Sequence, residues 1–352
     1  MLTTERGTVV TKPLSAKDAP TAQIFDFGVV IPHLDYSDHL MVCLRSILMQ
    51  EGSFTVHVHI QDGGVGTTAK TLVRECEQWA DPARFRLTYV QQPDSGAAQA
   101  INRGMSQVKA RMLTWLGADD MLMPGTLEAV GSLVAQHPTI SWATGLPHIV
   151  SESGVPAPHR GAAGFFRFPT GYSREALKRG LHAGDVNHGF IQQEGTFWSS
   201  DLWKTVGGLD ESLRLAFDFD LWCRFAEHAD LMEVVAPLGA FRKRVGQASE
   251  DMSGYLAEAD ALRKRYLQTF GPPGAGLEPT FVAFIDFDTY RWKIGRRSFL
   301  VVNRGLRIRS PHFAVGVFRF EVAAWLRTRA NRSAFARIVL KMFGRLRRWR
   351  AL

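Results

Sequence analysis

Between residues 25 and 116 the chain repeats one pattern: an apolar run of strand length, a turn, and a segment with apolar residues at helical spacing. Strands that alternate with helices along a chain pair in parallel and are joined by crossovers. The sequence therefore predicts an α/β fold with a doubly wound, mostly parallel, Rossmann-like sheet. The apolar runs cover residues 25–31, 56–60, 85–90 and 111–116.

The chain divides by composition into three parts. Residues 1–24 carry charges and no long apolar run, which predicts a flexible tail and argues against a signal peptide or membrane anchor. Residues 25–245 form the expected α/β domain, although the alternation weakens beyond Gly131. Residues 246–352 form a basic extension that we expect to be mainly helical.

The composition is that of a globular intracellular protein. At 352 residues and 45% hydrophobic, the chain can bury a large core. Its cysteines, Cys43, Cys76 and Cys223, are odd in number, far apart and without a Cys-x-x-Cys motif. This usage argues against a disulfide framework or zinc site and predicts reduced thiols in the cytoplasm.

The net charge of +8 hides a strong asymmetry. From Arg291 to the C-terminus there are 17 Lys and Arg against one acid, so this segment carries +16 and the rest −8. Within it, residues 333–352 place apolar and basic side chains on separate stripes, which predicts a basic amphipathic helix. Such a helix binds an anionic membrane surface, packs on its own domain or stays solvated. Nucleic acid is disfavoured because no binding module accompanies it. We expect peripheral attachment at the inner face of the cell membrane.

Two adjacent carboxylates, Asp119 and Asp120, directly follow the fourth apolar run. Neighbouring unpaired charges at the end of a buried strand are unfavourable, whereas Mg²⁺ or Mn²⁺ held with substrate phosphates would stabilise them. Ligands of open α/β sheets bind at this edge. The alternative is turn and cap chemistry, in which Asp120 serves Pro124 and the following helix. The pair is therefore a candidate metal site.

Four sequence patterns resemble one family when taken together and in order. They are VVIPHLDYSDHLMVCLRSILMQ, HIQDGGVGTT, QPDSGAAQAINRGMSQVKARMLTWLGADD and FWSSDLWKTVGGLDESLRLAFDFDLWCRFAE. They look like the family 2 glycosyltransferases of the GT-A fold, bacterial enzymes that build polysaccharides from nucleotide-sugars. The resemblance implies a GT-A-type sheet, Mg²⁺ or Mn²⁺, and inverting transfer of one sugar to a glycan or lipid-linked acceptor.

The resemblance places the nucleobase near the ends of the first two strands. Pro32, His33 and Asp35 match the loop that contacts the base, although His33 departs from the usual residue. Asp35 would serve equally well as a helix cap. Asp62 resembles the acid that hydrogen-bonds the base, a role that suits a fixed carboxylate.

The diphosphate and the metal are placed by the next two patterns. Gly96 and Asn102 resemble the segment beside the diphosphate, which is also explained as a turn and helix start. Asp119 and Asp120 match the metal-binding acids of the family. Gly117 stands where the family more often has an acid or Asn, which implies fewer protein ligands, with phosphate oxygens and water filling the shell.

The last pattern resembles the region of the catalytic base. Asp218 matches the carboxylate that takes the proton of the acceptor hydroxyl. Asp220 competes for this role, and either acid could instead pair with Arg224 on the same helix. Gln193 and Trp198 resemble an acceptor-side segment, to which Asp220 is also assigned, and Trp198 is equally suited to the core.

Two other functions were weighed. Residues 64–69 fit a loose Gly-x-Gly-x-x-Ala pattern, which would indicate an NAD-dependent dehydrogenase, but a full strand and helix already precede it. A non-catalytic, membrane-associated glycan-binding protein is the third class. A processive synthase is disfavoured because the chain has no Gln-x-x-Arg-Trp motif. His182 and His188 are interpreted as loop residues rather than ligands.

Overall fold

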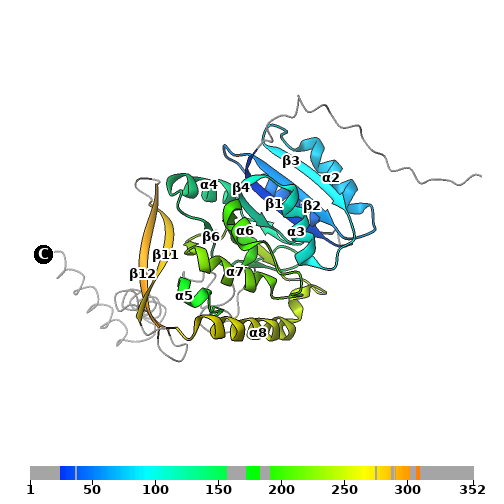
Figure 1. The fold of residues 1–352 in the computed structure, drawn as a ribbon. Coiled ribbons are helices and arrows are strands. Elements are labelled where there is room, and N and C mark those ends of the chain that lie inside the picture. The colour runs from blue at the N-terminus through cyan, green and yellow to red at the C-terminus, as the bar shows by residue number, and fades with distance from the viewer. Residues whose placement is uncertain are drawn as a thin grey trace, which may run out of the picture.

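The structure is a computed structural model that describes residues 24–35, 38–156, 172–182, 191–273, 276–286, 289, 291–301 and 307–309. Ten of its strands are β1 Phe25–His33, β2 Val56–Asp62, β3 Phe85–Gln91, β4 Ala110–Trp115, β6 Trp142–Thr144, β8 Thr196–Ser199, β9 Met232–Val234, β11 Gly276–Asp286, β12 Arg291–Val301 and β13 Arg307–Arg309. They form one sheet with the order β13-β12-β11-β9-β6-β8-β4-β1-β2-β3 (Figure 1).

A second sheet is small and has the order β5-β10-β7. Its strands are β5 Met121–Leu122, β10 Gly239–Arg242 and β7 Ile149–Val150. The α-helices are α1 Leu40–Leu48, α2 Thr68–Trp79, α3 Ala97–Gln107, α4 Thr126–Gln136, α5 Arg174–Leu177, α6 Ser200–Val206, α7 Phe217–His228 and α8 Met252–Phe270. Two short 3₁₀ helices cover Gln193–Gly195 and Ala248–Glu250.

The predicted parallel sheet is confirmed. β1 lies between β2 and β4 and is parallel to both, and β3 is parallel to β2. Farther along, β8 runs antiparallel to β4 and β6, whereas β9 is parallel to β6. The strands β1, β2 and β4 therefore end at the same edge, where the sequence places its candidate site residues.

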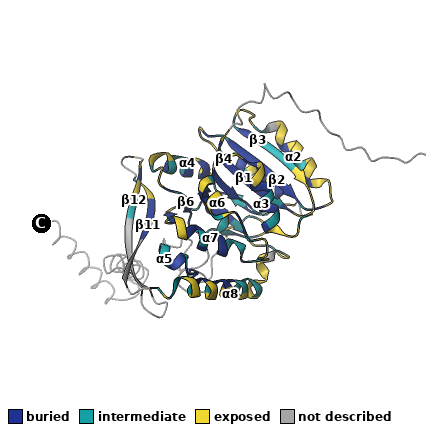
Figure 2. Cartoon of the chain, viewed as in Figure 1, coloured by how far each residue is buried: buried dark blue, intermediate teal, exposed yellow. Residues whose placement is uncertain are grey.

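Helices cover both faces of this sheet. Side chains along each strand point alternately to the two faces, so each face has its own hydrophobic core. Val29 and Ile31 of β1 belong to a core with α1, α2 and α4. Val30, between them, belongs to a core with α3, α6 and α7. Figure 2 shows the central strands buried and the outer face of α2 exposed. The sheet is thus doubly wound, and its centre is rigid enough to hold side chains at its edge.

The boundary expected at residue 245 does not separate two independent parts. Helix α8 packs on α7 through Ala259, Leu262 and Tyr266 against Phe219 and Cys223. Strand β11 pairs in parallel with β9 and extends the main sheet. The expectation of a mainly helical extension is wrong for residues 276–286 and 291–301, which form two long antiparallel strands. Their β-branched and aromatic residues favour strands, and β9 offers an edge to pair with.

Several other expectations concern location. The cysteines are buried and free, as predicted. Within the part of the chain that the structure describes, no helix is long and apolar enough to cross a membrane. The tail predicted at 1–24, except Ile24, and the amphipathic helix predicted at 333–352 lie outside the described residues.

Candidate active site

The acid pair lies at the carboxyl edge of the sheet, as the sequence predicts. The N–H of Leu116, just past β4, donates to the carbonyl of Val30 over 2.9 Å, so the chain leaves the sheet beside β1. It then turns sharply, because the N–H of Asp120 donates to the carbonyl of Gly117 over 2.9 Å. Both carboxylates are therefore presented close to the strand ends.

Gly117 is needed because the two carboxylates approach its Cα. An ideal Cβ at this position would lie 2.4 Å from Oδ2 of Asp120 and 3.1 Å from Oδ1 of Asp119. An acid or Asn at residue 117 would therefore push Asp120 away. The same contact shows that these two oxygens face one small region of space.

Two arginines contact the acid pair, and the sequence analysis did not predict them. Nε of Arg244 lies 2.7 Å from Oδ2 of Asp119. The backbone N–H of Arg242 donates to Oδ1 of Asp120 over 2.8 Å, and its Nε donates to the carbonyl of Asp119 over 2.8 Å. One oxygen of each acid is thus held by the β10 segment, while the other faces Gly117.

This arrangement fits a divalent cation. The donors are hard carboxylate oxygens, of the kind that Mg²⁺ and Mn²⁺ prefer. Among the residues described, no three or more His, Cys, Asp or Glu form a group that could hold a metal. A cation here would therefore take Asp119 and Asp120 as protein ligands and need phosphate oxygens or water to complete its shell.

Glu194 is a third carboxyl group near the acid pair, and the sequence analysis did not single it out because no motif marks it. It is 8% exposed. Burial, together with the charges of Asp218 and Asp119, raises the pKa of Glu194 to about 7. Burial and the charges of Glu194 and Asp119 also raise the pKa of Asp120 well above its usual range. The site therefore concentrates carboxyl groups in a poorly hydrated environment that favours their protonated forms.

Asp218 lies in the first turn of α7 and is partly exposed to solvent. Its Oδ1 accepts hydrogen bonds from the N–H of Phe219 over 2.7 Å and from the hydroxyl of Tyr255 over 3.1 Å. Burial raises the pKa of Asp218 to about 6. A partly exposed carboxylate with a pKa near neutrality can accept a proton from a bound hydroxyl group.

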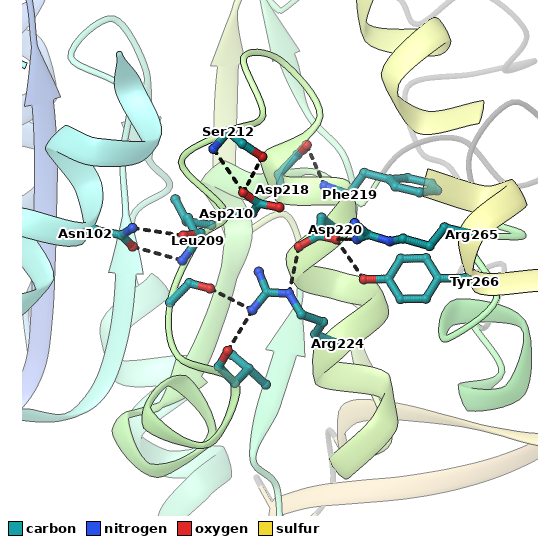
Figure 3. A network of polar contacts seen from close by, with 12 residues as sticks. Asn102, Leu209, Asp210, Ser212, Asp218, Phe219, Asp220, Arg224, Arg265 and Tyr266 are labelled. Carbon is teal, nitrogen blue, oxygen red and sulfur yellow. Dashed lines mark hydrogen bonds and ion pairs between the residues drawn. The ribbon is translucent and has the colours of Figure 1, made fainter. Parts of the chain in front are cut away.

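Asp220, the competing acid, is a structural residue. It is 1% exposed, and its carboxylate is 2.7 Å from Nε of Arg224, 2.7 Å from Nη2 of Arg265 and 2.8 Å from the hydroxyl of Tyr266 (Figure 3). Its assignment to the acceptor side or to proton transfer is therefore wrong, because the carboxylate is buried and both its oxygens are engaged, one by Arg224 of the same helix and the other by Arg265 and Tyr266 of α8. The pairing with Arg224 considered from the sequence is the correct interpretation.

The expected acceptor-side residues divide in the same way. Trp198 is fully buried in the core, 5.1 Å from Trp115 between ring centroids, so its acceptor role is wrong. Gln193 donates from Nε2 to the carbonyl of Trp115 at the end of β4, which places it beside the acid pair. His182 is buried and stacks on Phe219, as a structural histidine does. His188 lies outside the described residues.

The strand ends bring Pro32, His33 and Asp62 together, since β1 and β2 pair in register there. Nδ1 of His33 lies 2.9 Å from Oδ1 of Asp62, and the hydroxyl of Tyr89 donates to Oδ2 over 2.5 Å. Burial opposes ionisation, but the hydrogen bonds from Tyr89 and His33 hold the pKa of Asp62 below its usual value. Asp62, 1% exposed, is thus an ionised carboxylate that its neighbours hold in a fixed position at the strand ends.

Two further acids, Asp35 and Asp94, lie close to the glycine pair that follows β2. Asp35 has a left-handed backbone with φ of 51°, and its Oδ1 accepts from the N–H of Val65 over 3.1 Å. A Cβ on Gly64 would lie 2.2 Å from that oxygen, and a Cβ on Gly63 would lie 2.2 Å from Oδ2 of Asp94. The glycine pair therefore lets two carboxylates approach the backbone after β2.

Gly96 and Asn102 differ in what they can offer a ligand. Gly96 is exposed, precedes α3 and adopts φ of 144°, which favours glycine. The amide of Asn102 is occupied: it donates to the carbonyl of Leu209 and accepts from the N–H of Leu209 over 2.9 Å (Figure 3). It also donates to Glu211. Asn102 therefore clamps α3 to the loop before α7, and its expected contact with the diphosphate would require breaking that clamp.

Comparison with known proteins agrees with the family resemblance of the sequence. Residues 25–238 match the model of a family described as glycosyltransferase like family 2. An uncharacterized glycosyltransferase of Rickettsia typhi is 22% identical over 243 residues, which are 68% of this chain and 71% of that protein. A PGL/p-HBAD biosynthesis glycosyltransferase of Mycobacterium bovis is 34% identical over 113 residues, 32% of this chain and 42% of that protein. The chain thus matches less than half the length of the mycobacterial relative.

Solved structures show the shared fold. The crystal structure of S. aureus TarS 1-349 in complex with UDP-GlcNAc has a TM-score of 0.51 and 14% identity, over 69% of this chain and 66% of that chain. The GT-A fold predicted from the sequence is therefore confirmed. The dehydrogenase interpretation of residues 64–69 is wrong: the chain matches a glycosyltransferase family, and the N–H of Gly64 donates to Asp62 over 2.9 Å.

We expect Asp220→Asn to destabilise the protein by about 2 kcal/mol or more, because it weakens a buried set of charged hydrogen bonds. Urea unfolding followed by circular dichroism measures this change. The control is Asp201→Asn, whose pair with Lys204 is exposed and contributes about 0.5 kcal/mol or less. Equal stability of the two variants would contradict the structural role of Asp220.

Proposed function

Because the chain belongs to glycosyltransferase family 2, we propose that it moves one sugar from a nucleotide-diphosphate sugar to a glycan or lipid-linked acceptor. We further propose that the transfer is inverting and metal-assisted and that it serves the synthesis of a cell-surface polysaccharide. The activity of the whole protein is part of this proposal, because the chain matches only part of the length of these relatives.

One observation carries this proposal. The acid pair after β4 and the partly exposed Asp218 of α7 are proposed to share one site, because the ring of Phe217, next to Asp218, packs on Trp115, the last residue of β4, with ring centroids 6.2 Å apart. A carboxylate pair suited to a cation and phosphates thus lies close to a carboxylate suited to accept a proton. Transfer from a sugar diphosphate needs both, because charge develops on the leaving group as the acceptor hydroxyl loses its proton.

Asp218 acts as the general base in this mechanism. It takes the proton of the acceptor hydroxyl while that oxygen attacks the anomeric carbon, and the bond from this carbon to the diphosphate breaks on the opposite face. The configuration at the anomeric carbon is therefore inverted. Gln193, held against the end of β4, is positioned to border the acceptor side.

The nucleotide is proposed to lie along the ends of β1, β2 and β3. We propose that the nucleotide lies on the fixed pair formed by His33 and Asp62. Pro32, Asp35 and Gly96 would lie at its sides. Asp35 is the more accessible acid for reading N–H groups of a base, because Asp62 is already engaged by its neighbours.

Asp119 and Asp120 would hold Mg²⁺ or Mn²⁺ through the oxygens that face Gly117. The ion, when bound, would neutralise charge on the diphosphate leaving group. Arg244 keeps Asp119 in place by pairing with its other oxygen. The guanidinium also adds positive charge near the position proposed for the diphosphate.

We expect Asp119→Ala or Asp120→Ala to lose most of the Mn²⁺-dependent binding of a nucleoside diphosphate while keeping the fold. Thermal-shift measurements with UDP, GDP, dTDP and CDP, with and without Mn²⁺, test this, since a ligand at 100 times its Kd stabilises the native state by about 2.7 kcal/mol. The exposed Asp201→Ala is the control. Identical Mn²⁺-dependent shifts in all variants would rule out the metal assignment.

We expect Asp218→Asn to bind the donor normally but to transfer about 100-fold more slowly, because the general base is removed. In the unmodified enzyme the rate should rise with pH through about 6, since only the ionised carboxylate accepts a proton. Donor binding and release of the nucleoside diphosphate are measured across pH. An unchanged rate in Asp218→Asn would show that another group is the base.

We expect residues 333–352 to attach the enzyme to anionic membranes, where a lipid-linked acceptor would be found. Sedimentation with anionic vesicles should detect binding at low salt and partial release at high salt, because the Debye length falls from about 10 Å at 0.1 M to about 3 Å at 1 M. A chain ending at 332 should bind donor but not vesicles. Equal vesicle binding by both chains would contradict this role.

A further inference from the structure

Helix α8 lies beyond residue 238, where the match to the family ends, yet it packs directly on the helix that carries Asp218. The contact is apolar at its centre, where Ala259 and Leu262 of α8 meet Phe219 and Cys223 of α7. Three polar contacts accompany this packing, and each involves an acid at the interface.

The first contact is made just before α7. The residue before this helix, Ala216, has no side-chain oxygen for an N-cap hydrogen bond. Glu258 of α8 instead holds the backbone that leads into α7, because its Oε2 accepts from the N–H of Leu215 over 2.9 Å and of Ala216 over 2.8 Å. The start of α7, just before Asp218, is therefore fixed by α8.

The second contact is the buried carboxylate of Asp220, which Arg265 and Tyr266 of α8 hold one turn away from the first residues of α7 (Figure 3). A rotation of α7 about its axis would break these two bonds and leave the buried carboxylate with only Arg224 of its own helix among the partners described above. The direction in which Asp218 points is thus coupled to the position of α8.

The third contact reaches Asp218 itself. Tyr255 donates its hydroxyl to Oδ1 over 3.1 Å. Burial and the charge of Asp218 raise the pKa of Tyr255 well above its usual value, so the phenol remains a donor. The same oxygen accepts the N–H of Phe219, so both bonds converge on Oδ1. Among the described residues both hydrogen bonds go to Oδ1, so Oδ2 is the oxygen that we assign to an acceptor hydroxyl.

We propose that α8 is part of the catalytic unit and that Tyr255 is a positioning residue, which holds Oδ1 of Asp218 so that Oδ2 accepts the proton. This inference rests on the proposed role of Asp218 as base. It assigns a function to a helix outside the matched family region.

The test is the pH dependence of donor hydrolysis by full-length Tyr255→Phe. Water serves as the acceptor: it loses a proton to Asp218 as its oxygen bonds to the anomeric carbon and the bond to the diphosphate breaks. The probe is whichever of UDP-glucose, UDP-N-acetylglucosamine and GDP-mannose the unmodified chain hydrolyses. Loss of a hydrogen bond to the carboxylate raises the pKa of Asp218, so the midpoint of the rate should move upward by about half a unit to one unit.

The matched control is Tyr266→Phe, which removes the same hydroxyl from the same helix but from its bond to Asp220. It should lower the melting temperature and leave the pH midpoint unchanged, because Arg265 still holds Asp220 and thereby the orientation of α7. An unshifted midpoint in Tyr255→Phe, or an equal shift in Tyr266→Phe, would overturn the positioning role. Asp218→Asn separates the two proposals, because full hydrolysis by that variant would instead refute Asp218 as the base.

Discussion

The constraint on which the site depends is the closeness of four carboxyl groups in a poorly hydrated place near the strand ends. They belong to Asp119, Asp120, Glu194 and Asp218. The groups that surround them reduce their mutual repulsion. Burial raises the pKa of Asp120, Glu194 and Asp218, and the charges of neighbouring carboxylates add to this effect for Asp120 and Glu194. Arg244 and the N–H of Arg242 compensate part of the charge on the acid pair. The oxygens that face Gly117 remain for a cation, and the raised pKa of Asp218 suits it to proton transfer.

Such an edge depends on rigid supports, and the fold supplies them from distant parts of the sequence. Strand β10 holds the acid pair, although about 120 residues separate them in sequence. Helix α8 holds the start of α7 through Glu258 and Asp218 through Tyr255. Preorganised groups lose little free energy to reorganisation when charge develops. Helix α8, which lies after residue 245, is therefore packed against the helix that carries Asp218 and belongs to the catalytic unit that we propose.

The sequence predicted the features that depend on local pattern. Alternating strands and helices gave the doubly wound sheet, and the acids after β4 were placed correctly. It did not reveal Arg244, Glu194 or Tyr255, because their roles arise from contacts between segments far apart in the chain. Asp220 and Trp198 were misassigned for the same reason: burial, which decides their roles, is a property of the packed molecule.

The central claim is that the acid pair binds a cation together with the diphosphate. The most direct measurement is a crystal structure of the full chain with Mn²⁺ and the nucleoside diphosphate that stabilises it, using the anomalous signal of manganese. We predict one anomalous peak within coordination distance of Oδ1 of Asp119 and Oδ2 of Asp120, beside Gly117. A bound nucleotide with no manganese near either oxygen would contradict the claim.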